Sequence, residues 1–391
     1  MHKIDVSKGS LNSTVSNQWA TRPDDQKFLS LNDLHAQVAQ WQVESEARDC
    51  TPGSIAIGYD LENPDTLTAT IGDMEPLQLT NFAFDQIAGV AGAPGRYLRK
   101  LPTPLLAANL RYGLLANGQD EISAYVRQPE EGGELLRGIT SRKYGRIHDA
   151  EVVAAVQKIA GNGTGDTAWK VPGLIEWGSE HGISYNPHVD VTTETTTLYA
   201  SDRDIFMFLV DDTHPIEIGK LDDGSPDLIF PGFYTWNSEV GARTFGLATM
   251  FLRGVCQNRN LWGVEGFSEV VYRHTAGAPD KFALETAPKL IEFTNAPTAP
   301  IIAKVKAAKA AEICAVTQKD DDDRIEFLAK FGFSKKQAES LIRCGLEEEG
   351  HKPSNVWDMT QAVTAKARSI QLTDDRVTME QAGAKMMAKV G

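Results

Sequence analysis

Apolar residues recur every three to four positions in several parts of the chain, and this spacing predicts helices. The clearest case is Leu31, Leu34, Val38 and Trp41, which follow the N-cap chemistry of Ser30. A helical layer is therefore expected early in the chain. The same spacing predicts helices at 80–91, 103–115 and 149–159.

Shorter apolar runs bounded by turn residues predict strands. Ile205–Val210, flanked by Asp204 and Asp211, is predicted to be a buried strand. The region 169–275 is predicted to be rich in strands. Within it, the stretch 192–199 is dense in Thr, whose branched side chain packs well on a sheet. Four further strands, of which the last two form a hairpin, are predicted at 55–59, 67–71, 122–126 and 135–140.

A further helix is predicted for 238–256, where Ser238 is a good N-cap and the apolar residues from Phe245 to Val255 share one face. The stretch 299–314 is rich in Ala and Lys and strongly helical. A helical hairpin follows the acidic turn at 320–323, with Trp357 covering it. The residues predicted to pack in this hairpin are Phe327, Leu328, Phe331, Leu341 and Ile342.

These elements predict an α+β fold, a curved and mainly antiparallel sheet packed on helices, with a C-terminal helical tail. Residues 1–29 are polar and aperiodic, which predicts a flexible N-terminal arm. The main body is expected at 30–300, with an internal boundary near the Gly-rich loop 161–168. The helical C-terminal region is 301–391, and its tail is expected to be separable from about residue 318.

Composition narrows the class of protein. The chain has 391 residues, of which 41% are hydrophobic, and it contains no apolar run long enough for a membrane span. Its N-terminus lacks the apolar centre of a signal peptide, so a cytoplasmic protein is expected. The four cysteines form no CxxC pair, which predicts free thiols.

Charge is spread unevenly along the chain. The net charge of −14 argues against a protein that coats a duplex by bulk electrostatics. However, the segment between Arg96 and Arg146 holds nine basic and five acidic residues, a local excess of four positive charges. That excess favours a local nucleic-acid site, and it is equally typical of a solvated face.

No complete catalytic motif is present. The loop 161–165 is neither GxGxxG nor a P-loop, and there is no GxSxG elbow. The sequence therefore predicts that the protein binds no cofactor and no metal ion. His181 and His188, with Glu176, Glu180 and Asp190 nearby, keep open a divalent-metal site, although their spacing matches no familiar ligand set.

The first candidate segment runs from Arg137 to His148 and mixes small, basic and aromatic residues. Its cations could contact phosphates while Tyr144 stacks on a base, the combination that single-strand binding uses. In that interpretation Arg142, Lys143, Tyr144 and Arg146 lie on an exposed surface and form one basic patch with Arg243, Arg253 or Arg259. In the alternative interpretation, Tyr144 packs on the core and the arginines pair with acids.

The second candidate segment, 236–262, places arginine and asparagine near the ends of the predicted helix, and Arg273 follows a later strand. Such residues can contact phosphates and bases, and they can equally cap the helix or line an internal polar network. Across both segments, the predicted nucleic-acid-binding residues are Arg137, Arg142, Lys143, Tyr144, Arg146, Arg243, Arg253, Asn258, Arg259, Trp262 and Arg273.

Several segments of the sequence resemble members of one protein family. They are GITSRKYGRIHDAEVV (138–153), NSEVGARTFGLATMFLRGVCQNRNLWG (237–263), RHTAG (273–277), and the stretches 79–102 and 356–369. Together they resemble the phage/plasmid-like protein family grouped as domain of unknown function 932. Gln257 stands where that family more often has Thr.

The resemblance implies residence on phages, prophages and conjugative plasmids. Elements of this kind often encode single-strand annealing proteins, whose cores join a curved sheet to helices and assemble into rings. The predicted function is therefore binding or annealing of single-stranded DNA in phage or plasmid recombination, as a homo-oligomer. The alternatives are a metal-dependent enzyme of nucleic-acid metabolism, and a phage structural or host-interaction protein.

Overall fold

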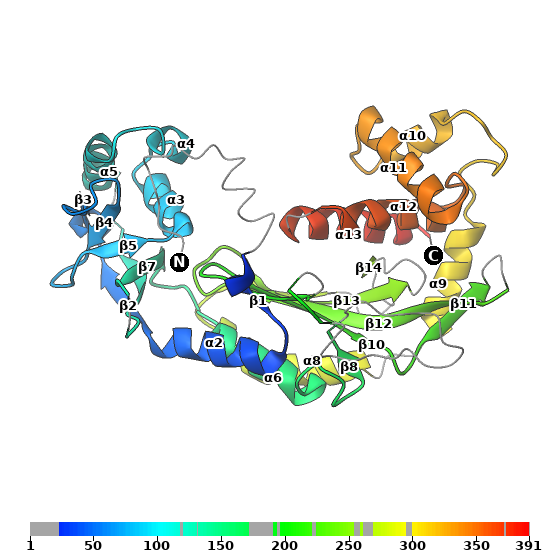
Figure 1. Cartoon of the computed structure of the whole chain (residues 1–391), viewed down its shortest axis with the longest axis horizontal. Coiled ribbons are helices and arrows are strands. Elements are labelled where there is room, and N and C mark those ends of the chain that lie inside the picture. The colour runs from blue at the N-terminus through cyan, green and yellow to red at the C-terminus, as the bar shows by residue number, and fades with distance from the viewer. Residues whose placement is uncertain are drawn as a thin grey trace.

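The computed structural model shows an α+β protein with two mainly antiparallel sheets that do not close into a barrel (Figure 1). The single curved sheet predicted from the sequence is thus divided between two sheets. None of the described helices is both long and apolar enough to cross a membrane. The structure describes residues 23–117, 120–130, 132–171, 191–193, 196–220, 224–253, 259–260, 269–294, 299–370 and 373–390.

The smaller sheet has six strands in the order β2-β6-β7-β5-β4-β3. All neighbours are antiparallel except β5 and β7, and β6–β7 is the predicted hairpin. One face is covered by helices α3 (Asn81–Val90), α4 (Gly95–Leu98) and α5 (Thr103–Asn117), which bury Phe84, Ile87 and Leu110 against it. The strands are β2 (Ser45–Cys50), β3 (Ala56–Tyr59), β4 (Leu67–Thr70), β5 (Leu77–Leu79), β6 (Ile122–Arg127) and β7 (Leu135–Ser141).

The larger sheet has nine strands with the central order β1-β9-β10-β12-β13-β14. Its first strand comes from the end of the predicted arm, because β1 (Lys27–Phe28) pairs with β9 (Leu198–Ala200). The remaining strands are β8 (Trp169–Lys170), β10 (Ile205–Asp211), β11 (Ile216–Lys220), β12 (Pro226–Asn237), β13 (Phe245–Arg253), β14 (Arg259–Asn260) and β15 (Glu269–Tyr272).

Helices pack on both faces of the larger sheet (Figure 1). Helices α2 (Leu31–Val43), α6 (Asp149–Ala160) and α8 (Ala278–Thr294) lie below it and share one apolar core with it. The opposite face carries a stacked aromatic row, in which the Phe208 and Tyr234 rings lie 5.4 Å apart and those of Tyr234 and Trp236 5.2 Å apart. The buried strand predicted at 205–210 is β10 and lies in the middle of this sheet.

The described residues of the C-terminal tail form helices joined by turns and no strand beyond an isolated bridge between Glu312 and Asn355, in agreement with the predicted helical tail. Leu328, Leu341, Ile342 and Trp357 share one core, and Phe327 and Phe331 pack against it, so the predicted hairpin is confirmed. The same core also takes in Ile216, Ile229 and Phe251 of the larger sheet. Its helices are α9 (Ala299–Ala310), α10 (Asp322–Ala329), α11 (Lys335–Glu349), α12 (Val356–Arg368) and α13 (Thr373–Met387).

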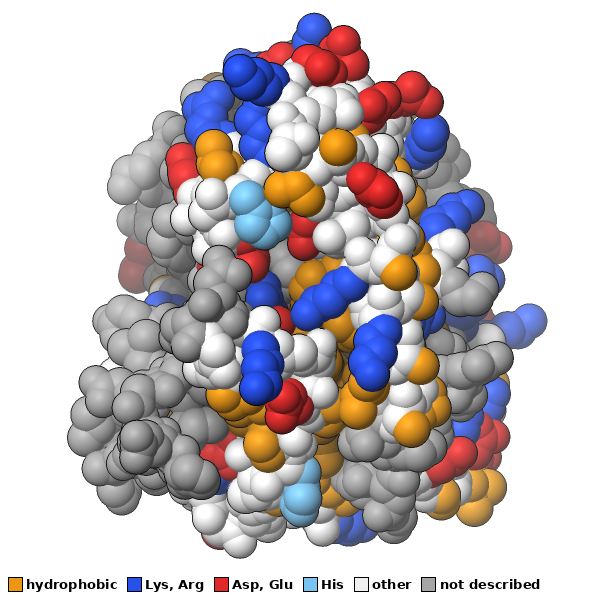
Figure 2. Space-filling view, turned by 90° about the vertical axis from the view of Figure 1, so that its right-hand side faces the viewer, with side chains coloured by type: hydrophobic (Ala, Val, Ile, Leu, Met, Phe, Trp, Pro, Cys, Tyr) orange, Lys and Arg blue, Asp and Glu red, His pale blue; other side chains and the backbone are white. Residues whose placement is uncertain are grey.

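Figure 2 looks onto the end of the molecule formed by this tail and α9. Acidic and basic side chains mix near the top of that face, whereas Lys and Arg side chains lie among apolar ones at its centre. Lys306 is exposed on α9, which carries neither an acidic nor an aromatic residue.

The helix predicted for 238–256 is wrong, because Phe245–Arg253 forms strand β13. All nine residues of β13 are buried. A strand covered on both faces is apolar at every position, so its residues also satisfy a helical spacing, and periodicity cannot separate the two. Ser238 does act as a cap, but of a turn: its hydroxyl accepts from the backbone N–H of Ala242 at 3.0 Å.

Candidate functional site

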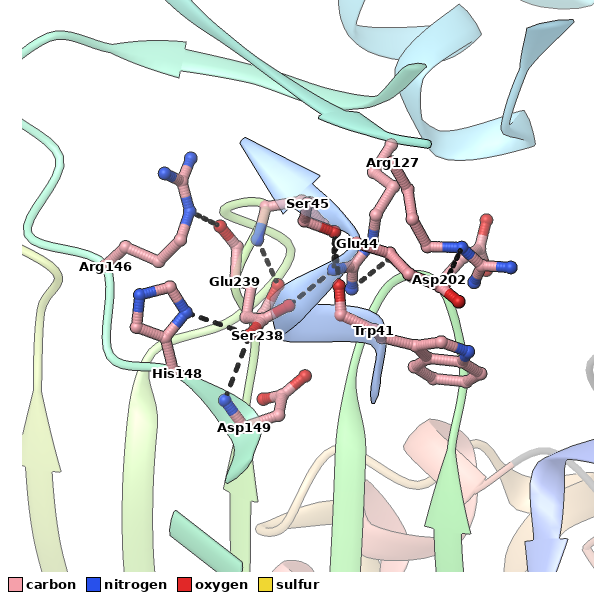
Figure 3. Close-up of polar contacts among 12 residues, drawn as sticks. Trp41, Glu44, Ser45, Arg127, Arg146, His148, Asp149, Asp202, Ser238 and Glu239 are labelled. Atoms are coloured by element: carbon pink, nitrogen blue, oxygen red, sulfur yellow. Dashed lines mark hydrogen bonds and ion pairs between the residues drawn. The ribbon is translucent and has the colours of Figure 1, made fainter. Parts of the chain in front are cut away.

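A buried ion pair joins the two sheets, and Figure 3 shows its carboxylate, Glu239, with the neighbouring residues His148, Asp149 and Arg146. Arg137 of β7 is fully buried, and its Nη1 lies 2.6 Å from Oε2 of Glu239, which follows β12. A charge is costly away from water unless it is paired and hydrogen-bonded, so these two side chains hold each other in place. The site at the sheet junction is built around this pair.

Glu239 also receives hydrogen bonds from the segment that leads into α6. Its Oε1 accepts from the backbone N–H of Asp149 at 3.1 Å and lies 3.3 Å from Nδ1 of His148. Arg146 Nε donates to the Glu239 carbonyl at 2.8 Å. The first turn of α6, β7 and the turn after β12 therefore meet at one carboxylate.

A second carboxylate lies beside the first and is fully buried as well. Asp149 Oδ1 accepts from Asn237 Nδ2 at 2.8 Å, while its Oδ2 has no hydrogen-bond partner among the described residues. Burial raises the pKa of Asp149, and the negative charge of Glu239 raises it further. Burial also acts to raise the pKa of Glu239, but Arg137 and His148 outweigh it and lower that pKa to about 2.

These opposite shifts predict opposite pH effects on stability. The folded-state pKa of Glu239 lies below its usual 4.5, so its stabilisation is present above pH 4.5 and is lost as pH falls toward about 2. The folded-state pKa of Asp149 lies above its usual 3.8, so its ionisation in the folded protein costs stability at higher pH.

We therefore expect Asp149→Asn to match or exceed the wild type in free energy of unfolding at neutral pH. Glu239→Gln should lower that free energy at neutral pH and remove the acid sensitivity between pH 4.5 and about 2. Urea unfolding curves at a series of pH values measure both. A loss in Asp149→Asn that is larger at pH 7 than at pH 4 would contradict the assignment.

Aromatic rings close one side of the junction. The Tyr144 ring stacks on His274 with centroids 4.7 Å apart, and its hydroxyl donates to the Ser238 carbonyl at 2.7 Å. Gly145 lies so close to the chain at Thr275 that a Cβ there would sit 1.9 Å from the Thr275 carbonyl oxygen. This packing fixes the turn, and burial raises the pKa of Tyr144 above its ordinary value.

The prediction that Tyr144 and Arg146 lie on an open surface is wrong. Both are half-buried, and the Arg146 guanidinium lies 3.8 Å from the centroid of the Tyr125 ring. Arg137 is buried at the ion pair. For Tyr144 and Arg137 the structure matches the alternative interpretation, in which the tyrosine packs internally and the arginine pairs with an acid. Arg146 instead bonds to the backbone carbonyl of Glu239.

Arg142 and Lys143 are exposed, as predicted. Arg142 is held between two carboxylates, with Nε 2.9 Å from Asp49 and Nη1 also bonded to Glu121, so its charge is locally neutralised. Arg273 is exposed as well.

Of the remaining predicted residues, Arg243 and Arg253 do not extend this exposed surface. Arg243 Nε bonds to Asp204 at 2.8 Å, and Arg253 is buried in an ion pair with Asp227. Ion pairing and burial therefore occupy both cations within the protein. Arg259 lies in β14, while Asn258 and Trp262 are outside the described residues.

No family model, curated protein or solved structure matches the chain. Among the described residues, no group of three or more His, Cys, Asp or Glu is placed to hold a metal ion. His181 and His188, the alternative metal ligands, lie outside the described residues.

The acidic half of the junction, Glu239 and Asp149, was not among the residues predicted from the sequence. Glu239 and Asp149 carry no motif, and their approach to Arg137 depends on how two sheets meet. One signal existed: a lone Arg within the apolar run Leu135–Thr140 predicts a buried ion pair, because a buried charge needs a partner.

A second set of missed residues lies on the helices that cover the smaller sheet. The segment from Gln86 to Gln119 contains no acidic residue, in a chain with a net charge of −14. Arg96, Lys100 and Arg111 are exposed there. Tyr97 and Tyr112 are exposed as well, at 57% and 79% of their surfaces.

Proposed function

We propose that the protein binds single-stranded nucleic acid through the outer surface of α4 and α5. The observation that carries the proposal is the exposure of two tyrosines together with basic residues on an acid-free segment of an acidic protein. Exposed rings stack on unpaired bases, and nearby cations neutralise phosphates. An acidic surface elsewhere would keep the strand on this one face.

This proposal keeps the predicted function and changes its site. Of the residues predicted from the sequence, Lys143 and Arg273 remain exposed, but they do not belong to α4 or α5. Action on a phage or plasmid, assembly as a homo-oligomer and membership of the phage/plasmid-like family are parts of the same proposal. Annealing of two strands would need both strands held with their bases accessible, which a surface of this kind allows.

The test is fluorescence anisotropy with a labelled single-stranded oligonucleotide over a range of salt concentrations. Arg96→Ala with Lys100→Ala should weaken binding and reduce the logarithmic salt slope by about 1.4, since each phosphate contact on a single strand contributes about 0.7. Tyr112→Ala should cost about 1–3 kcal/mol of binding free energy with little change in slope.

Lys306→Ala is the matched control, because it removes an exposed positive charge from α9, which carries no aromatic residue. It should leave the affinity unchanged. If the wild type shows no affinity for single-stranded DNA or RNA at low salt, the proposal fails.

A protein-interaction role is the second candidate, and one observation favours it. Leu105, Tyr112 and Leu115 are exposed along one face of α5, at 51%, 79% and 66% of their surfaces. A protein partner that docks on this face of α5 would bury Leu105 and Leu115 as well as Tyr112. Leu105→Ser with Leu115→Ser should then abolish association with a protein partner while the salt slope of strand binding stays unchanged.

A further inference from the structure

One edge of the smaller sheet is open along strand β2. Among the described strands β2 pairs only with β6, so its other edge has no strand beside it. Ala47, Arg48 and Asp49 are exposed in the middle of β2, and Val43, just before the strand, is 89% exposed. An edge of this kind presents backbone N–H and C=O groups that can pair with another strand.

The opposite edge of the same sheet is covered within the chain. Helix α5 packs beside β3, and Nε of Arg111 on that helix donates to the carbonyl of Ile57 in the strand. The two edges of the smaller sheet therefore differ, and β2 is the one that a further strand can join.

The alternation of hydrogen bonds along β2 determines which backbone groups point outward. The N–H of Gln128 donates to the carbonyl of Glu44 at 2.7 Å, so Glu44 and every second residue after it face β6. The backbone groups of Ser45, Ala47 and Asp49 then point away from β6. A further antiparallel strand would exchange its hydrogen bonds with these three residues.

The charged side chains of β2 favour a second copy of the chain as the partner. Glu46 and Arg48 lie on one face of the strand and form an exposed ion pair at 2.6 Å. When two copies pair antiparallel about Ala47, Glu46 of each copy lies directly opposite Arg48 of the other, where neighbouring strands come closest.

The same charges also select the register. Because only every second residue of β2 points its backbone outward, the neighbouring registers differ by two residues. One of them places Glu46 opposite Glu46 of the second copy, and the other places Arg48 opposite Arg48. Like charges directly opposite one another are destabilising, so the register about Ala47 is favoured.

We propose that the protein dimerises by antiparallel pairing of β2 with β2 of a second copy, about a two-fold axis at Ala47. Figure 1 shows α2 running from beneath the larger sheet to the start of β2, so the antiparallel joint places the two larger sheets at opposite ends. Residues directly opposite in a sheet point to the same face, so the α4 and α5 surfaces of both copies face the same side. The pairing itself needs no nucleic acid, whereas a surface shared by one strand rests on the proposed function.

Sedimentation velocity of the full-length protein without nucleic acid tests the inference. The wild type should show the 42.7 kDa monomer in equilibrium with a dimer of twice that mass. Glu46→Arg gives each β2 two cations and Arg48→Glu gives it two anions, so each variant alone should weaken dimerisation at least tenfold. An equal mixture of the two variants should restore dimers, because each cation then lies opposite an anion. The double variant, Glu46→Arg with Arg48→Glu, should dimerise as well.

A matched control and a backbone variant complete the series. Lys330→Glu reverses an exposed cation that pairs with Glu326 in the C-terminal tail, and it should dimerise like the wild type. Ala47→Pro keeps both charges and removes an N–H that points away from β6, so it should weaken the dimer while β2 stays paired with β6. The charge variants still decide the matter if Ala47→Pro fails to fold. A wild type that is monomeric at every concentration, charge variants that dimerise like the wild type, or a mixture that stays monomeric overturns the inference.

Strand binding is measured separately, so the two proposals can fail independently. A dimer without affinity for single strands would retain the β2 pairing while the proposed function fails, and strand binding by a monomeric wild type would have the reverse meaning. If both hold, an oligonucleotide long enough to reach two surfaces should bind the wild type more tightly than Ala47→Pro. A short oligonucleotide should bind both proteins alike.

Discussion

Arg137→Ala is expected to lower the free energy of unfolding by about 3–5 kcal/mol, the usual cost of removing one partner of a buried ion pair. The cost arises because Glu239 loses its closest cation, at 2.6 Å, and stays buried beside Asp149, with only the more distant His148 and Arg146 nearby. The guanidinium also lies 5.1 Å from the Tyr125 ring, so packing between the sheets is lost too. Chemical unfolding at pH 7 measures the change.

Two further variants separate charge from packing. Arg142→Ala removes an exposed arginine from the next turn and should leave stability nearly unchanged. Combining Arg137→Met with Glu239→Gln removes both charges while retaining an acceptor for the Asp149 backbone, and it should recover part of the loss. If the double variant is no more stable than Arg137→Ala, the uncompensated charge is not the cause.

Arg253→Ala is expected to cost a similar free energy and to loosen the C-terminal tail. Arg253 Nε bonds to Asp227 Oδ1 at 2.9 Å, and its Nη1 also bonds to Glu349 at the end of α11. The side chain thus links the larger sheet to the tail, 5.8 Å from the Trp357 ring. Lys309 lies 3.4 Å from Asp227 and can offset part of the loss.

Limited proteolysis and chemical unfolding together give the measurement. The variant should be cut faster within the tail helices than the wild type, and its unfolding should become less cooperative. Arg343→Ala, an exposed position on the same helix as Glu349, serves as the control and should behave as the wild type. Equal cutting rates in all three proteins would mean that the Arg253 contacts do not hold the tail, and that the apolar core shared with the larger sheet is sufficient.

The sequence predicted the amphipathic elements well, because their pattern is set by one buried face. Helices α2, α3, α5 and α6 and the tail hairpin follow directly from apolar spacing. Strand β13 was predicted to be a helix, because both of its faces are buried and its sequence lacks the alternation of apolar and polar residues that marks a strand.

The candidate site was harder to predict, for a different reason. A segment rich in basic and aromatic residues, such as the one around Tyr144, can lie on a binding surface or inside a polar network. Its composition does not distinguish the two. The partner of Arg137 lies 102 residues away, so no local pattern could assign it. Exposure decided between the two interpretations, and exposure depends on tertiary packing.

The order of elements along the chain has a consequence for synthesis of the protein. The smaller sheet, with strands between Ser45 and Ser141, is inserted between α2 and α6, which pack against each other in the finished fold (Figure 1). Lys27 of β1 pairs with Tyr199 of β9, so the first strand of the larger sheet finds its neighbour only after the whole insertion has left the ribosome. The inserted sheet contains all of its own strands and can fold first. Nascent chains of increasing length should therefore protect β6 and β7 from proteolysis well before β1.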